Sequence, residues 1–189
     1  YRGARQICID VVEHDANGLI HPIAMTGQTA GQEAGTFTNP INSGPDPWMR
    51  YHRGNYYLTT TQGDCIRMWK APTLAGLKTA RGVVLWRGDD PSRSQGIWAP
   101  EFHFIDGRWY LYYTAMAATK VDTTHRMHVL ESEGDDPLGP YHYKGRLFDP
   151  ANDFYAIDGS VFQHPGDGAW YFLWAAHPGH RIRIAKMAN

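Results

Sequence analysis

Residues 101–114, EFHFIDGRWYLYYT, contain the pattern that decides the fold. Polar and apolar side chains alternate up to Phe104, the pair Asp106-Gly107 follows, and an aromatic stretch then begins at Trp109. Alternation with a period of two is typical of a half-buried strand, and an Asp-Gly pair favours a tight hairpin because it accepts positive φ. The stretch therefore predicts a β-hairpin.

The same pattern occurs at two other places. Residues 46–60 read DPWMRYHRGNYYLTT and residues 158–174 read DGSVFQHPGDGAWYFLW. Each copy begins with an acidic residue and has a glycine in its turn, and Tyr57, Tyr110 and Tyr171 align with spacings of 53 and 61 residues. A third strand-like stretch follows each hairpin, at residues 66–70, 126–130 and 181–185.

A repeat of this size, made of antiparallel strands, is typical of the blades of a β-propeller. The best helix candidate, residues 74–79, is short and contains Gly76. A β-sandwich with coincidentally similar hairpins is the alternative, but the match at three places favours the propeller. We therefore predict an all-β chain with about three blades. Since a ring typically needs at least four blades, we expect the chain to be incomplete.

Charge and hydropathy exclude several classes of partner. The 189 residues include 18 basic and 19 acidic side chains, for a net charge of -1, without a block of like charge that would suit nucleic acid or a membrane surface. The most apolar run, residues 109–118, is far shorter than the roughly 18 residues of a membrane span. We predict neither a nucleic-acid nor a membrane partner, and we predict that Cys8 and Cys65 are unpaired thiols.

Three motifs in the order SGPDPW (43–48), IWAPE (97–101) and AIDGSVF (156–162) lie at the starts of the three copies. Each motif is a weak signal by itself. Together they resemble glycoside hydrolase family 43, which acts on arabinose- and xylose-containing polysaccharides, from about Thr36 to Asn189. The resemblance implies a five-bladed β-propeller with a substrate pocket at one end of its central axis. It also implies hydrolysis with inversion by an Asp base, a Glu acid and a second Asp that tunes the acid.

The resemblance also divides the chain. Residues 1–26 predict a hairpin around Asn17-Gly18 and resemble the closing part of such a propeller. Residues 27–35 are polar and Gly-rich, as in a linker. We therefore predict the tail of a preceding propeller, a linker, and the N-terminal part of a catalytic propeller over 36–189 that stops before its general acid. The alternative is that the opening strand belongs to the same propeller.

Two aspartates are the candidate catalytic residues. Inverting hydrolysis needs two carboxyl groups roughly 6.5 to 9.5 Å apart, one ionised and one protonated. Asp46 opens a first strand, which in a propeller lines the channel, and is the candidate base; the alternative is a turn aspartate that caps local amides. Asp158 holds the equivalent place in the third copy, and the resemblance makes it the residue that raises the pKa of the acid. The family's Glu-Gly-Pro motif does not follow Asp158, so we expect the acid beyond Asn189. Glu133 lies ahead of that place, in an acidic turn.

Trp98 and Trp48 are candidate sugar-stacking rings, because sugar faces pack on aromatic rings. A strand tryptophan is usually part of the core, and this alternative is stronger for Trp48. Glu101 could reach the channel as a substrate contact or a structural residue. We predict no metal site, because His125 and His128 would point to opposite faces of a strand. No cofactor is expected to be required, although the resemblance leaves a structural calcium ion open.

The predicted function is hydrolysis of O-glycosidic bonds in arabinose- and xylose-containing plant polysaccharides by an α-L-arabinofuranosidase. β-Xylosidase and endo-arabinanase are alternatives within the family, because loops that the sequence does not reveal set the specificity. A non-catalytic glycan-binding propeller is the alternative of another class. The expected partner is an oligo- or polysaccharide, and an extracellular location follows only from such a substrate.

Overall fold

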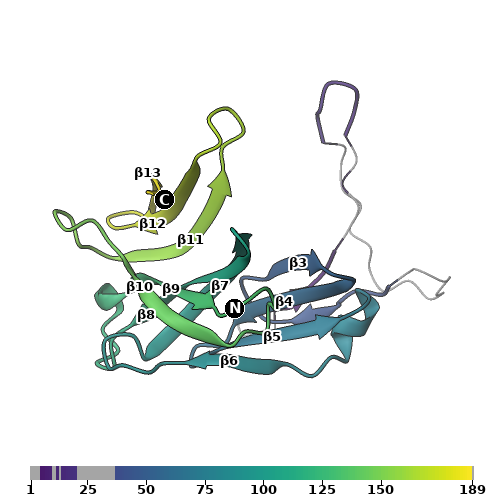
Figure 1. Ribbon diagram of the computed structural model, residues 1–189, viewed down its shortest axis with the longest axis horizontal. Helices are drawn as coiled ribbons and strands as arrows, with labels where there is room; N and C mark the ends of the chain where they lie inside the picture. Colours follow the sequence, from purple (N-terminus) through teal and green to yellow (C-terminus); the bar gives the residue numbers. More distant parts are fainter. Residues whose placement is uncertain (1–4, 10–11, 13, 21–36, 189) are drawn as a thin grey trace.

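The computed structural model describes residues 5–9, 12, 14–20 and 37–188. These residues form almost only β-structure, arranged in four antiparallel sheets. Three of the sheets follow one another along the chain and lie side by side in space (Figure 1). This succession of sheets confirms the all-β prediction and the propeller blades. No helix in the described part of the chain is long and apolar enough to span a membrane.

The first blade is a four-stranded sheet in simple sequential order. Its strands are β3 (Trp48–His52), β4 (Asn55–Thr61), β5 (Cys65–Ala71) and β6 (Val83–Arg87). Arg53 and Gly54 form the β3–β4 turn, and both have positive φ, 45° and 78°, as a tight hairpin requires. The helix candidate over 74–79 is only the 3-10 helix η1 (Ala75–Lys78), which connects β5 to β6.

The second blade repeats this plan. Its strands are β7 (Gln95–Ile105), β8 (Arg108–Met116), β9 (Arg126–Ser132) and β10 (Tyr141–Leu147), with the 3-10 helix η2 (Asp122–Thr124) before β9. The predicted turn at Asp106-Gly107 joins β7 to β8, again with positive φ at both residues, 49° and 84°. The fourth strand of each complete blade, β6 or β10, has no counterpart in the predicted repeat, which held only three strands.

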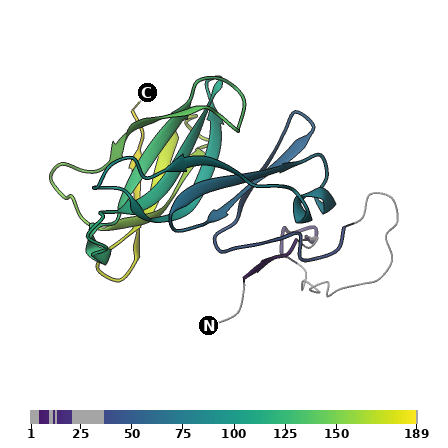
Figure 2. The ribbon, with the colours of Figure 1, turned by 90° about the horizontal axis from the view of Figure 1, so that it is seen from below.

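The third blade has three strands in the described part of the chain: β11 (Ala156–Gln163), β12 (Trp170–Ala176) and β13 (Arg181–Lys186). All three were predicted. β13 is an edge strand, and its outward side chains Ile182 and Ile184 are 72% and 57% exposed. Figure 2, which shows the molecule from below, places the first blade (blue) beside the second (teal to green), with the yellow strands of the third blade behind the second.

Apolar side chains join the blades face to face, since burying them against each other removes them from water. The cluster between the first two blades includes Tyr57, Ile66, Met68, Ile97, Phe102, Leu111 and Leu130. The cluster between the second and third blades includes Tyr112, Met127, Val129, Val161 and Phe172. These two cores set how the innermost strands β3, β7 and β11 stand next to one another.

The N-terminal segment contacts the first blade. β1 (Gln6–Ile7) pairs with β2 (Asn42–Ser43), and Ile7 is buried in the cluster that includes Leu58 and Leu77. The predicted turn at Asn17-Gly18 is present, with Gly18 at φ 80° and a bridge between His14 and Ile20. The opening strand thus pairs with the approach to β3. The predicted linker 27–35 lies outside the described residues, and the division into two propellers stays a prediction.

Candidate active site

The candidate site is built where each innermost strand begins. The registers of the three hairpins place Asp46, Ala99 and Asp158 at equivalent positions of the three blades. All three residues have positive φ, 53°, 43° and 53°. Residues other than glycine seldom adopt this conformation, so its recurrence marks one backbone bend that the blades share. Two of the three equivalent residues are aspartates, and they lie at the same end of the blades.

Glu101 lies two residues further along β7, at the position that Trp48 and Ser160 occupy in the other blades. The acidic residues that open the three sequence repeats are therefore not equivalent, because β7 carries Ala99 where the other blades have aspartate. The proline that follows Asp46 and Ala99 in both copies is the sequence signal that identifies this alignment.

Asp46 is an exposed carboxylate held by side chains. Thr61 Oγ1 donates a hydrogen bond to Asp46 Oδ2 at 2.8 Å, and Arg5 Nη1 lies 3.7 Å from Asp46 Oδ1. The side chain of Asp46 is 43% exposed. These contacts orient the carboxylate and leave it open to water, as a base that takes a proton from water requires.

Asp158 is the carboxyl group that its surroundings perturb. Partial burial, and then the negative charges of Asp46 and Glu101, raise the pKa of Asp158, while His180 and His125 act in the opposite direction. A charge acts on a neighbour this way only at short range in a partly solvated site. The two aspartates, Glu101 and the two histidines therefore form one electrostatic cluster near the starts of the innermost strands.

Glu101, a member of this cluster, is held by a row of hydrogen bonds. Its Oε2 atom accepts a hydrogen bond from Nε2 of the buried His103 at 3.0 Å, and Arg50 Nη2 lies 3.5 Å from His103 Nδ1. A carboxylate can only accept, so the imidazole proton sits on Nε2 and Nδ1 faces the guanidinium. Glu101, whose side chain is 20% exposed, thus has a fixed direction toward the site.

Trp98 stands beside the cluster, directly before Ala99. One face of its ring stacks on the fully buried His125, with centroids 4.0 Å apart and planes inclined by 30°. His125 is itself held through Nδ1 by the carbonyl oxygen of Asp122 at 2.8 Å. Trp98 is half-buried, so its ring is supported from behind and stays a candidate for sugar stacking.

Trp48 has a different environment. Its Nε1 atom donates to the carbonyl oxygen of Phe102 at 3.0 Å, and its ring centroid lies 4.9 Å from that of His103. The guanidinium of Arg50 lies 5.0 Å from the centroid of the same ring. These contacts join the first blade to the second, so the packing interpretation of Trp48 accounts for its position.

Two glutamates of the second blade lie at the other end from Asp46. Glu131 is near the end of β9, where it accepts hydrogen bonds from Lys144 and Tyr110. Glu133 follows β9 and contacts Nε2 of His142. Because β9 begins at the end of the blade where the candidate site lies and runs away from it, neither glutamate can join Asp46.

The described residues contain no group of three His, Cys, Asp or Glu side chains that could hold a metal ion. The structural calcium ion that the resemblance left open has no such ligand set among the described residues. The buried His128 has a different environment, since the hydroxyl of Tyr143 lies 3.1 Å from its Nδ1 atom. Burial and the charges of three nearby guanidinium groups lower the pKa of His128 to about 4. Cys8 and Cys65 are free thiols.

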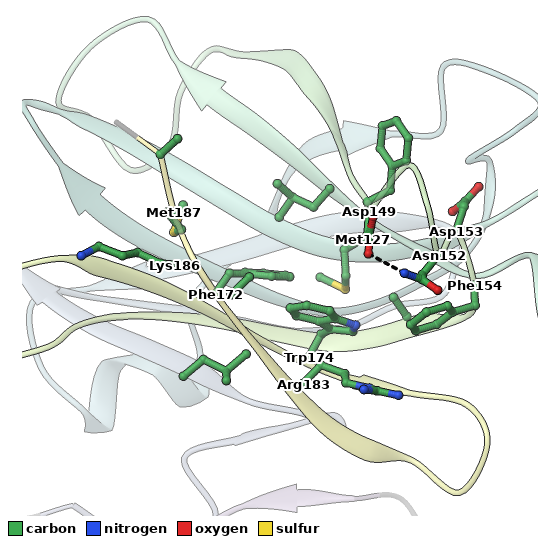
Figure 3. A pocket seen from close by; sticks show the side chains of 16 residues that line it. Met127, Asp149, Asn152, Asp153, Phe154, Phe172, Trp174, Arg183, Lys186 and Met187 are labelled. Carbon is green, nitrogen blue, oxygen red and sulfur yellow. Dashed lines mark hydrogen bonds between the residues drawn. The ribbon is translucent and has the colours of Figure 1, made fainter.

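A pocket of about 640 Å³ lies apart from the candidate site (Figure 3). Met127, Phe172, Trp174 and Arg183 line it, and Asn152 donates a hydrogen bond to Asp149 at its rim. The pocket lies between the outer strands of the second and third blades, beside the edge strand β13. None of the candidate catalytic or substrate-binding residues contributes to its wall.

Comparison with known proteins assigns the part of the chain that holds the three blades to a family. Residues 37–189 match the model of glycosyl hydrolases family 43. The chain belongs to this family. The crystal structure of an α-L-arabinofuranosidase from Lactobacillus brevis superposes with a TM-score of 0.71 at 33% sequence identity, over 81% of this chain and 52% of that one. The fold is thus part of the five-bladed propeller of family 43.

Several curated relatives carry arabinofuranosidase names. The extracellular exo-α-(1→5)-L-arabinofuranosidase of Streptomyces avermitilis is 38% identical over 165 residues, which are 82% of this chain and 34% of that protein. The α-L-arabinofuranosidase 43 of Humicola insolens is 34% identical over 134 residues, 69% of this chain and 27% of that protein. This family 43 chain therefore spans only about a third of the length of these two relatives.

Proposed function

We propose that the protein hydrolyses O-glycosidic bonds with inversion and removes α-L-arabinofuranosyl units from arabinose- and xylose-containing plant polysaccharides. Membership of family 43 and the arabinofuranosidase names of the relatives support the reaction and the sugar. The extracellular name of the Streptomyces relative supports action outside the cell. The ligand is accordingly an oligo- or polysaccharide.

The observation that carries this proposal is the convergence of Asp46 and Asp158. Asp46 is the proposed general base: it is exposed, oriented by Thr61, and able to take a proton from the attacking water. Asp158 is the proposed tuning residue, because a carboxylate in a partly buried cluster makes ionisation of a neighbouring carboxylic acid less favourable. Trp98 and Glu101 are proposed to contact the sugar.

The general acid is proposed to be a glutamate encoded beyond Asn189. The departing oxygen must receive a proton in the same step, so the reaction needs a protonated carboxyl group across the bond from Asp46. Of the glutamates that the structure describes, Glu101 is engaged by His103, and the other two lie at the far end of the blade.

β-Xylosidase and endo-arabinanase remain alternatives within the same site, since both would use the same carboxylates. A non-catalytic glycan-binding propeller would keep Trp98 and lack the acid. The discriminating assay offers the full-length protein a chromogenic α-L-arabinofuranoside, a chromogenic β-xyloside and linear arabinan. Release of arabinose from the first substrate supports the proposal, whereas binding of arabinan without any hydrolysis supports the binding propeller.

Replacement of Asp46 tests the catalytic role directly. In the full-length enzyme, Asp46→Asn should lower kcat on the arabinofuranoside by about 100-fold or more with little change in KM, because the amide keeps the shape and removes the base. Asp106→Asn is the matched control: Asp106 has a similar φ of 49° but lies in the β7–β8 turn, away from the site. Near-normal turnover by Asp46→Asn would rule out the base role.

A further inference from the structure

Two threonines occupy equivalent positions in adjacent blades. The residue before each strand-opening bend pairs across the hairpin with Thr61 in the first blade and with Thr114 in the second. Thr61 Oγ1 accepts a hydrogen bond from the backbone N–H of Ala99 at 2.6 Å. Thr114 Oγ1 accepts one from the backbone N–H of Asp158 at 3.2 Å. Each hydroxyl thus ties its own blade to the strand-opening residue of the next blade.

The two hydroxyls differ in what they donate to. A hydroxyl group has one hydrogen, and an amide N–H can only donate, so the hydrogen of each threonine is free for a second partner. Thr61 donates it to Oδ2 of Asp46 at 2.8 Å. The residue of the second blade that is equivalent to Asp46 is Ala99, which has no side-chain acceptor. Thr114 Oγ1 donates instead to the sulfur atom of Met127 at 3.3 Å.

We infer that Thr61 is a positioning residue for the general base, through a relay that runs from the Ala99 amide to the Thr61 hydroxyl and on to Asp46 Oδ2. This inference rests on the proposed function of Asp46. The amide of Ala99 fixes the direction of the hydroxyl hydrogen, and the hydrogen fixes the carboxylate. Oδ1, which lies 3.7 Å from Arg5 Nη1, is then the oxygen left to meet the attacking water. No proton leaves Thr61 during the reaction.

The relay also sets the distance between the base and Trp98. The N–H that Thr61 binds belongs to the peptide that joins Trp98 to Ala99, so the carboxylate of the first blade and the candidate stacking ring of the second share one anchor. Thr61 is half-buried at the end of β4, and its branched Cβ restricts its χ1 rotamers. Loss of the anchor would let Asp46 shift against the sugar, and a misplacement of about 1 Å can lower turnover by about 100-fold.

The test compares four forms of the full-length protein: wild type, Thr61→Val, Thr61→Ser and Thr114→Val. Thr61→Val keeps the shape and removes both hydrogen bonds, and it should lower kcat by about 10- to 100-fold with KM within about twofold of wild type. Thr61→Ser keeps the hydroxyl and should recover most of kcat. Thr114→Val breaks the same link between blades without touching Asp46. Because Thr114 binds the amide of Asp158, this variant serves only to measure, by denaturant unfolding, the stability loss that both valine variants share.

A double-mutant cycle separates positioning from general weakening of the fold. If Thr61 acts through Asp46, Thr61→Val should have almost no effect in an Asp46→Asn background, because the base is already absent. An equal factor in both backgrounds would overturn the inference, and so would a Thr61→Val enzyme with kcat within twofold of wild type. If Thr61→Val does not fold, Thr61→Ala replaces it in the same cycle. Two other outcomes are distinguishable from a failure of the Thr61 inference. A wild-type protein without hydrolytic activity would contradict the proposed function itself, and normal turnover by Asp46→Asn would contradict the base role.

Discussion

At the scale of single residues, the site brings two carboxyl groups close enough for the charge of one to raise the pKa of the other. Asp158 is partly buried beside Asp46 and Glu101, and the pKa of Asp158 is raised, first by burial and then by those charges. A raised pKa means that the folded chain binds the proton of Asp158 more tightly than the unfolded chain does. The resulting contribution to stability is therefore full at low pH and is lost as the pH rises through the raised pKa.

Asp158→Asn should consequently stabilise the fold at pH 7 while it lowers activity. The gain should be small, about 1 to 3 °C in the melting temperature, because the group is partly solvated. It should disappear below the ordinary aspartate pKa, where the wild-type residue is protonated in both states. Thermal melts at pH 3 and pH 7, together with the pH profile of kcat, check this; an unchanged profile would assign Asp158 to orienting the acid instead.

Asp167 offers a control of opposite sign. Hydrogen bonds from the Ala169 amide and the Tyr171 hydroxyl lower the pKa of Asp167 to about 2. A lowered pKa gives stability that is present above the ordinary aspartate pKa and is lost as the pH falls toward 2. Asp167→Asn should therefore lower the melting temperature at pH 7, with the difference shrinking as the pH approaches 2, and it should leave kcat unchanged.

At the scale of the element, the segment that enters β3 decides where Asp46 stands. Gly44 has a φ of 131°, and a Cβ atom on it would lie 2.5 Å from Oγ1 and 2.8 Å from Cβ of Thr60. Gly54, in the β3–β4 turn, also has positive φ, 78°, but a Cβ atom there would meet nothing within 4 Å. Alanine at Gly54 therefore tests the energetic cost of a positive φ alone, whereas alanine at Gly44 adds the cost of a steric clash with Thr60.

Gly54→Ala should lower the free energy of unfolding by about 1 to 2 kcal/mol, the ordinary cost of a left-handed conformation. Gly44→Ala adds overpacking against Thr60, so its loss should be larger by about 1 to 3 kcal/mol. Denaturant midpoints of the two variants measure the difference. Gly44→Ala should also lower kcat, because Thr60 precedes the residue that holds Asp46; equal stability losses would show that Thr60 yields to the added methyl group.

At the scale of the whole molecule, one edge of β13 has no partner strand among the described residues. β13 pairs with β12 on one side only, and it exposes Ile182 and Ile184 on a strand of alternating Arg and Ile. An exposed apolar edge strand is a template for pairing with another copy. In the first two blades, β6 and β10 occupy the place next to the third strand and cover it.

Residues 1–189 expressed alone should therefore aggregate, and without the proposed general acid they should be inactive. The combined change Ile182→Lys and Ile184→Lys should increase the soluble fraction at least severalfold, because lysine on an edge strand opposes pairing. Ile20→Lys is the control, since Ile20 is 59% exposed but lies on the short hairpin outside the blades. Size-exclusion chromatography measures the outcome. A monomeric and active wild-type chain 1–189 would contradict the expectation and would return the general acid to Glu101, because Glu133 lies at the other end of the blade.

The sequence by itself determined the architecture and the candidate carboxylates. Period-two alternation and glycine turns are local features of the sequence, so they predicted the hairpins at 46–60, 101–114 and 158–174. The family motifs lie at the starts of these hairpins. The fourth strands were missed, because strands such as VVLWR (83–87) are short and lack a turn signal that repeats between the blades.

Tertiary structure alone decided which residues meet. In the sequence repeats, Glu101 is the acidic residue that corresponds to the two aspartates. The strand pairing shows instead that Ala99 is the equivalent residue of the second blade. The packing of Trp48 between blades and the hold of Thr61 on Asp46 join atoms 15 to 54 residues apart along the chain. Such contacts depend on the twist and stacking of whole sheets, which are set by the buried faces of neighbouring blades and leave no local signal in the order of the residues.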